Sequence, residues 1–158
     1  MALSWRRATR DDALLLWQWA NDAETRRQSF TEAPIPYADH VQWLERRLAS
    51  DATRLWIFSD AAGAVGQVRV ERTGDDAEIN IAVAPERRGR GLGTAMLRGA
   101  LDAVRAEWGD AVRPRAQVFE RNAASLRMFR RCGFQEVGTR VARGEPVIVF
   151  ERATAETP

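Results

Sequence analysis

The sequence predicts an α/β fold in which strands and helices alternate along a single domain. With 158 residues, the chain is long enough to bury one sizeable core. Short runs of alternating polarity, typical of strands, are interleaved with stretches in which apolar residues recur at helical spacing. Near the middle, a turn rich in glycine and arginine joins an apolar strand to an amphipathic helix. We assign residues 1–152 to the domain and residues 153–158 to a C-terminal tail.

The first half of the chain is predicted to hold two helices and four strands. Thr9 and Asp12 have the spacing of a capping box, which predicts that a helix begins there. On that helix, Leu14, Trp17 and Ala20 recur at helical spacing and are expected to face the core. The other predicted segments are strand Leu3–Ala8, loop Asn21–Pro36, helix Tyr37–Leu48 and strands Arg54–Ser59, Val65–Glu71 and Ala77–Val83.

The second half is predicted to hold two helices and three strands. Asn122 is a favourable N-cap for the last helix, and Gly133 is typical of the residue that follows a helix end. The helix after the glycine turn carries an apolar stripe made of Leu92, Met96, Leu97, Ala100, Leu101 and Val104. The remaining predicted strands are Arg115–Phe119, Phe134–Thr139 and Pro146–Glu151.

The composition excludes several classes of function. The formal net charge is +2, and the basic residues, all arginines, are not interleaved with aromatic residues in a stripe, so we expect no nucleic-acid partner. His40 is the single histidine, which excludes a multi-histidine metal site, and Cys132 is the single cysteine, which excludes an intrachain disulfide. Since no signal peptide or long apolar segment is seen, we expect a cytoplasmic protein without a membrane partner.

The most specific feature is the turn that begins after Val83. It contains Gly89, Gly91 and Gly93, and glycine allows positive φ and close approach of the backbone to a ligand. The helix that follows offers unpaired N–H groups and the positive end of its dipole. Together with the arginines of the turn, these groups predict a cradle for a pyrophosphate. The spacing of the glycines matches neither the Walker pattern nor the dinucleotide fingerprint.

The spacing Arg-x-x-Gly-x-Gly, at Arg88, Gly91 and Gly93, resembles the coenzyme A pyrophosphate loop of the GNAT N-acetyltransferase superfamily. The segment from Val118 to Phe134 resembles the family's second signature, and the predicted order of elements resembles the GNAT fold over nearly the whole chain. The resemblance implies a central, mixed, mostly antiparallel twisted sheet of about seven strands flanked by about four helices. It also implies acetyl-CoA as the cosubstrate.

The resemblance further implies which residues bind the coenzyme. Pantetheine amides would pair with the free edge of the strand before the glycine turn, where a backbone N–H could also steady an oxyanion. Asn122 would bond the pantetheine arm. The implied coenzyme-binding residues are Ile81, Ala82, Val83, Arg88, Gly89, Arg90, Gly91, Leu92, Gly93, Thr94, Asn122, Ser125 and Phe129.

The catalytic groups are less well defined. Many family members place a tyrosine four residues before the glycine that ends the last helix, but here that residue is Phe129, and the single tyrosine, Tyr37, lies in another element. The thiolate is then expected to leave unprotonated or to take a proton from solvent. Glu78, which shares a strand face with Asn80, is the candidate base, and Glu120 is a second one. An equally good interpretation is that Glu78 has no catalytic role and is polar because it lies on a half-exposed strand face.

The acceptor residues are expected in the N-terminal half. The segments Trp19 to Phe30 and Asp39 to Trp43 resemble the GNAT branch that acetylates nucleotide-linked amino sugars, as in pseudaminic acid biosynthesis. This resemblance implies that the acceptor contacts Arg26, Arg27, Ser29 and His40, with the arginines on a diphosphate and His40 on a hydroxyl or a proton.

The function predicted from the sequence is direct acetyl transfer from acetyl-CoA to a primary amine of a small molecule, with a UDP-amino sugar among the candidates. Transfer to a protein N-terminus or to an aminoglycoside is an alternative within the superfamily. A coenzyme-A-sensing module without turnover is an alternative from another class. It stays open because Phe129 stands where many family members have a tyrosine. A homodimer is compatible with each of these interpretations.

Overall fold

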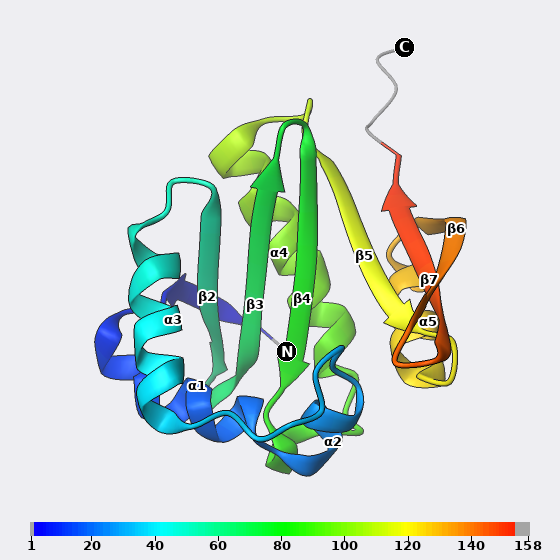
Figure 1. Ribbon diagram of the computed structural model, residues 1–158. Coiled ribbons are helices and arrows are strands. Elements are labelled where there is room, and N and C mark those ends of the chain that lie inside the picture. The colour runs from blue at the N-terminus through cyan, green and yellow to red at the C-terminus, as the bar shows by residue number, and fades with distance from the viewer. Residues whose placement is uncertain (1, 154–158) are drawn as a thin grey trace.

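The computed structural model describes residues 2–153 and shows one seven-stranded sheet with helices on both faces (Figure 1). The strands are β1 (Ser4–Arg7), β2 (Thr53–Asp60), β3 (Gly63–Thr73), β4 (Asp76–Val83), β5 (Arg113–Phe119), β6 (Phe134–Ala142) and β7 (Glu145–Arg152). The helices are α1 (Ala13–Ala20), α2 (Ala23–Arg27), α3 (Tyr37–Ala49), α4 (Leu92–Trp108) and α5 (Ala123–Arg131). Residues 154–158 of the predicted tail lie outside the described residues.

The sheet has the strand order β1-β2-β3-β4-β5-β7-β6. All neighbouring strands are antiparallel except β4 and β5, which are parallel. The expected mixed, mostly antiparallel sheet is therefore confirmed.

Two predictions about the N-terminal helices are corrected. The predicted loop 21–36 contains a fifth helix, α2, which begins where the Asp22 side chain accepts a hydrogen bond from the Thr25 N–H at 3.1 Å. The expected face of α1 is also wrong, because Leu16 and Trp19 are buried whereas Leu14 is 53% exposed. Apolar residues surround α1 on every side, so their spacing did not define one face.

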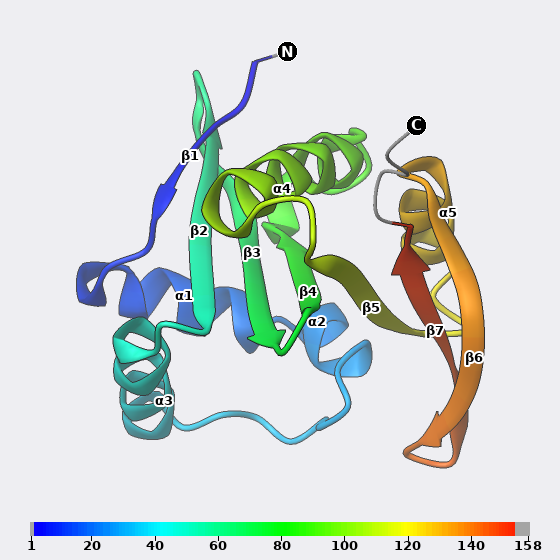
Figure 2. The ribbon, with the colours of Figure 1, turned by 90° about the horizontal axis from the view of Figure 1, so that it is seen from above.

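The sheet separates two layers of apolar residues. Figure 2 shows α4 on one side of the sheet and α1, α2 and α3 on the other. The larger cluster packs α4 and α5 onto one face and includes Met96, Leu97 and Phe129, whereas the smaller cluster packs α1 and α3 onto the other face around Leu44 and Trp19. Helices thus cover both sides of the sheet, although β3 and β4 bury only one of their faces fully.

The sheet opens between β4 and β5. The two strands pair only from Asp76 with Arg113 to Glu78 with Arg115, and they then separate, as Figure 1 shows below the top of β4. On its other edge, β4 stays paired with β3 as far as Val83. The split leaves the second half of β4 with a free backbone edge beside the glycine turn.

Candidate active site

A cleft of about 1030 Å³ lies along the split between β4 and β5. Residues from both helix layers line it, including Thr94 of α4 and Ser125 of α5 from one layer and Trp19 of α1 and His40 of α3 from the other. The cleft therefore joins the glycine turn on one face of the sheet to the N-terminal helices on the other. A molecule that lies in the split can reach both faces.

The edge of β4 presents backbone groups to this cleft. The Ala84 N–H donates to Val65 O of β3 at 2.8 Å, and backbone groups alternate in direction along a strand. Ala82 therefore faces β3, and the N–H and C=O of Ile81 and Val83 face the split. An edge of this kind can pair with the amides of an extended ligand.

The glycine turn supplies the end of the cleft next to α4. Gly89 and Gly91 have φ values of +78° and +73°, and Gly91 is the N-cap of α4. A Cβ atom added to Gly93 would lie 2.9 Å from Met128 Sδ, so the first turn of α4 packs closely on α5. The N–H groups of that turn are free to bind an anion. Arg88, Gly89, Gly91, Leu92, Gly93 and Thr94 line the cleft, whereas Arg90 is exposed outside it.

Both arginines before the first glycine are held by carboxylates. Arg87 makes a two-pronged pair with Asp60, at 2.8 and 2.9 Å, and these bonds hold the pKa of the Asp60 carboxyl below its usual range. Arg88 donates to Asp22 Oδ2 at 2.5 Å and to Thr25 Oγ1 at 3.1 Å. The turn is thus tied to β2 on one side and to α2 on the other.

Helix α5 forms the wall opposite the turn. Asn122 caps it, accepting a hydrogen bond from the Ser125 N–H at 3.3 Å, and both residues line the cleft. Phe129 is buried and packs against Phe134 and Phe150, with ring centroids 5.1 and 5.9 Å apart. No hydroxyl is therefore present where many family members place a tyrosine.

His40 lines the cleft from α3, and it is 4% exposed. Its Nδ1 atom has no hydrogen-bond partner among the described residues. Burial lowers the pKa of His40, and the nearby positive charges of Arg26 and Arg69 lower it further. These effects favour the neutral form of the imidazole.

The predicted acceptor arginines have different roles in the structure. Arg26 lines the cleft but donates to Ala20 O at 2.6 Å, to Thr31 O at 2.9 Å and to Ser29 Oγ at 3.2 Å. These bonds fold the segment around α2. Arg27 is exposed, pairs with Glu24 and does not line the cleft.

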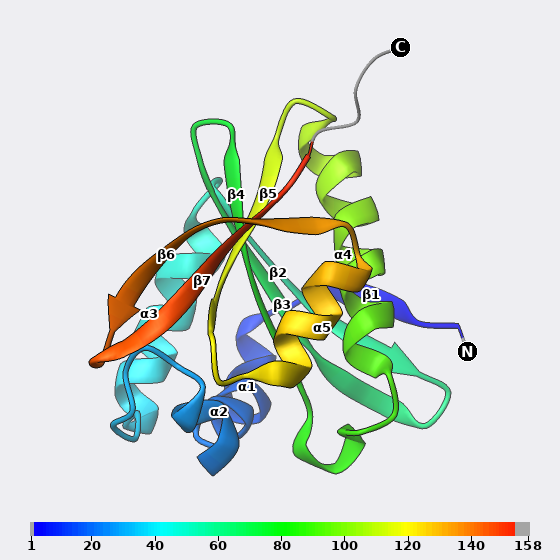
Figure 3. The same ribbon diagram turned by 90° about the vertical axis from the view of Figure 1, so that its right-hand side faces the viewer.

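The C-terminal hairpin holds this segment from outside. Arg143, in the turn between β6 and β7, donates to Arg27 O at 3.0 Å and to Ser29 O at 2.8 Å. Arg121 donates to Arg27 O at 2.6 Å. Figure 3 shows the tip of the hairpin reaching toward α2. The carbonyl groups of Arg27, at the end of α2, and of Ser29, just after it, thus accept hydrogen bonds from side chains that are distant in sequence.

Glu78 lies where β4 and β5 separate. Its Oε1 accepts a hydrogen bond from Gln117 Nε2 of β5 at 2.5 Å, so this contact bridges the closed end of the split. Glu78 is exposed and does not itself line the cleft, although Asn80, two residues further along the same face, does. Glu120 is exposed after β5 and also lies outside the lining.

Three polar residues of the cleft floor were not predicted. Gln67, Arg69 and Gln117 line the cleft from β3 and β5. On β3 the signal was present, because Gln67 and Arg69 alternate with the buried Val68 and Val70. Such alternation identifies a polar face, but only the pairing of strands places that face in a cleft.

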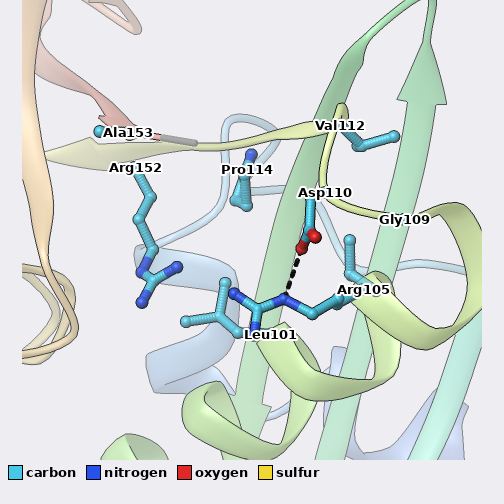
Figure 4. A pocket seen from close by; sticks show the side chains of 9 residues that line it. Leu101, Arg105, Gly109, Asp110, Val112, Pro114, Arg152 and Ala153 are labelled. Carbon is cyan, nitrogen blue, oxygen red and sulfur yellow. Dashed lines mark ion pairs between the residues drawn. The ribbon is translucent and has the colours of Figure 1, made fainter. Parts of the chain in front are cut away.

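Other features of the described residues carry no site. A second hollow of about 30 Å³, at the end of α4 beside β5, has room for about two water molecules, and the 2.7 Å ion pair of Arg105 with Asp110 lies beside it (Figure 4). Residues 2–153 contain no group of three side chains suited to hold a metal ion. None of their helices combines the length and apolarity that a membrane span requires.

Sequence comparison identifies relatives among acetyltransferases. The chain is 30% identical over 116 residues to the L-methionine sulfoximine/L-methionine sulfone acetyltransferase of Pseudomonas aeruginosa, which covers 69% of this chain and 66% of that protein. It is 40% identical over 63 residues to an N-acetyltransferase of Streptomyces griseus, which covers 40% of this chain and 31% of that protein. The chain thus spans less than two thirds of the length of either relative.

Solved structures of acetyltransferases share the fold. The spermidine N-acetyltransferase of Vibrio cholerae, in complex with CoA and spermine, superposes with a TM-score of 0.85 at 20% identity, covering 97% of this chain and 96% of that chain. The aminoglycoside acetyltransferase AAC(6')-Ib, in complex with ribostamycin and coenzyme A, gives 0.82 at 20% identity, covering 96% and 93%.

These relatives lend no support to the predicted nucleotide-sugar branch. The model of the family described as acetyltransferase (GNAT) domain matches residues 3–135, which is most of the chain. The cleft along the β4–β5 split and the glycine turn at the start of α4 lie within this match. We conclude that the chain belongs to the GNAT acetyltransferase domain family.

Proposed function

We propose that the protein is an N-acetyltransferase that transfers acetyl from acetyl-CoA directly to a primary amine of a small molecule. One observation carries the proposal. The cleft along the free edge of β4 passes through the split in the sheet, with the glycine turn on one side and residues of α1 and α3 on the other. A thioester held along this edge would present its carbonyl to an amine on the other face.

The chain offers groups for the pyrophosphate and for the pantetheine arm of the coenzyme. The N-terminal N–H groups of α4 and the Arg88 guanidinium suit the pyrophosphate. The backbone groups of Ile81 and Val83 suit the pantetheine amides, with Asn122 and Ser125 facing them from α5. A backbone N–H of the same β4 edge would stabilise the oxyanion that forms when the amine attacks.

The reaction requires a neutral amine. The amine nitrogen forms a bond to the acetyl carbon, the carbon–sulfur bond breaks, and the amine proton passes to a base. Glu78, at the closed end of the split, and the neutral His40 are the two candidates. The thiolate can leave without an acid, because an ordinary thiol has a pKa of about 8.5.

The names of the relatives suggest three kinds of acceptor, namely amino-acid analogues, polyamines and aminoglycosides. The nucleotide-sugar acceptor draws little support from the site, because the donors of Arg26 are bound to its own loop and Arg27 lies outside the cleft. A small amine therefore remains the best description of the acceptor.

Release of free thiol from acetyl-CoA tests the proposal. The purified protein should release thiol above background with at least one amine among L-methionine sulfone, spermidine and ribostamycin, and mass spectrometry should detect the acetylated amine. Calorimetry supplies the independent measurement of acetyl-CoA binding. Tight binding with no thiol release from any amine would contradict the proposal and favour a sensing module.

A further inference from the structure

Resting on the proposed N-acetyltransferase function, we infer that the acceptor amine also carries a carboxylate, and that Arg69 binds this carboxylate beside the reacting amine. Arg69 lies on β3, in the row with Asn80 of β4, and lines the cleft. Its side chain is 27% exposed. The guanidinium is therefore largely shielded from water, yet a molecule in the cleft can reach it.

The positive charge of Arg69 is only partly balanced. Glu71 Oε1 lies 3.3 Å from Arg69 Nε and also 3.3 Å from Arg47 Nε, so one carboxylate serves two guanidinium groups. The Arg69 guanidinium also lies over the Trp43 ring, 5.0 Å from its centroid. Burial lowers the pKa of Arg69, Glu71 and more weakly Glu78 oppose this effect, and the positive charge of Arg47 adds to it. A further negative charge at this place would be stabilised.

Arg26 adds a second unbalanced charge to the same space. Its three hydrogen bonds go to neutral acceptors, two backbone carbonyls and the hydroxyl of Ser29, and no carboxylate pairs with it among residues 2–153. Burial lowers its pKa as well. Arg26, Arg69 and His40 all line the cleft, and the charges of both arginines lower the pKa of His40.

Carboxylates in this part of the cleft are fewer than cations. Asp39 and Glu24 line it, but Glu24 is already paired with Arg27. Arg46 lines it as a further cation. A polyamine or an aminoglycoside would bring several positive charges against these arginines, whereas a carboxylate would complement them.

The same charges would assist the reaction. A like charge nearby disfavours the protonated form of an amine, so the arginines favour the neutral amine that attacks the thioester. When the acceptor amine is still protonated, its carboxylate, bound to Arg69, offsets the repulsion between the ammonium group and the arginines. Arg69 would thus serve as a specificity-determining residue through its contact with the acceptor.

Matched acceptors test this inference. A panel of L-amino acids, each paired with its carboxamide, would be compared with putrescine and kanamycin in the thiol-release assay. The best amino acid should exceed its carboxamide in kcat/KM by about tenfold or more, since a charged hydrogen bond is lost with the carboxylate. Arg69→Gln should remove most of this preference, chiefly through KM, and should leave the Kd for acetyl-CoA unchanged.

Two further variants control for structural damage. Arg69→Lys keeps the charge and should recover part of the preference. Arg72 lies on the same strand but outside the cleft, and its guanidinium lies over the Trp108 ring, 5.7 Å from the centroid. Arg72→Gln should therefore keep the full preference. Equal kcat/KM for acid and carboxamide, or higher values for putrescine or kanamycin, would overturn the inference alone. If none of the amines tested causes thiol release, the proposed function is overturned as well.

Discussion

Arg88 of the glycine turn donates to Asp22, the residue that caps α2, although 66 positions separate them. Burial raises the pKa of Asp22, but the hydrogen bonds from Arg88 and from Thr25 outweigh it, and the pKa ends below its usual range. The glycine turn and helix α2 therefore share one carboxylate. A pyrophosphate bound by Arg88 would compete with Asp22 for the guanidinium.

Replacing Asp22 tests this link. Asp22→Ala should cost about 1 kcal/mol of local stability, because α2 loses its side-chain cap. The amide protons of Thr25 and Arg26, which bond to Asp22, should then exchange faster with solvent. Asp51→Ala, which removes an exposed carboxylate elsewhere, is the control. Unchanged exchange in α2 would show that the cap and the ion pair do not hold this helix.

The glycine turn gives a prediction about coenzyme binding. Gly91→Asp and Gly93→Asp should abolish acetyl-CoA binding in calorimetry, since each adds a negative charge where the pyrophosphate should lie. At Gly93 the new side chain would also displace Met128. Gly138→Asp adds the same charge at an open position of β6 and should bind normally. Normal affinity in a folded Gly91→Asp variant would refute the assignment of the turn.

The positions of Tyr37 and Phe129 give a prediction about the general acid. Tyr37 is 44% exposed, packs edge-on against Trp17 and does not line the cleft, so Tyr37→Phe should keep nearly full kcat. Phe129→Tyr should also be tolerated, because Phe129 lines the cleft and the variant restores the residue common in the family. Loss of turnover in Tyr37→Phe with intact coenzyme binding would instead identify Tyr37 as an acid.

Local sequence signals predicted most of the fold. The alternation along β4 and the apolar stripe of α4 each specify one buried face, and both agree with the structure. Helix α2 escaped prediction because five residues cannot show an apolar period, although Asp22 and Thr25 had the spacing of a cap. In α1, consecutive leucines and two tryptophans left the buried face undefined.

The sequence could place residues of contiguous motifs in the cleft lining, but not residues that strand pairing brings there. The glycine turn and Asn122 could be placed because each lies at a helix start. Arg69 could not, because its place beside Trp43 depends on the packing of α3 against the sheet. The binding roles given to these residues remain predictions, which the variants above test.

His40 gives a prediction about stability and pH. Its pKa in the folded protein is below that of a free histidine. As the pH falls below about 7, the unfolded chain therefore takes up a proton more readily than the native protein does. The free energy of unfolding should therefore fall as the pH drops through about 6.5, the ordinary histidine value. Since His40 is the single histidine, His40→Gln should remove this decline.

Urea unfolding of both proteins from about pH 7.5 to about pH 5.5, above the range where carboxylates titrate, measures the two stability curves. Parallel curves for the two proteins would show that His40 titrates equally in both states, and would remove the basis for a neutral, buried imidazole at the acceptor side.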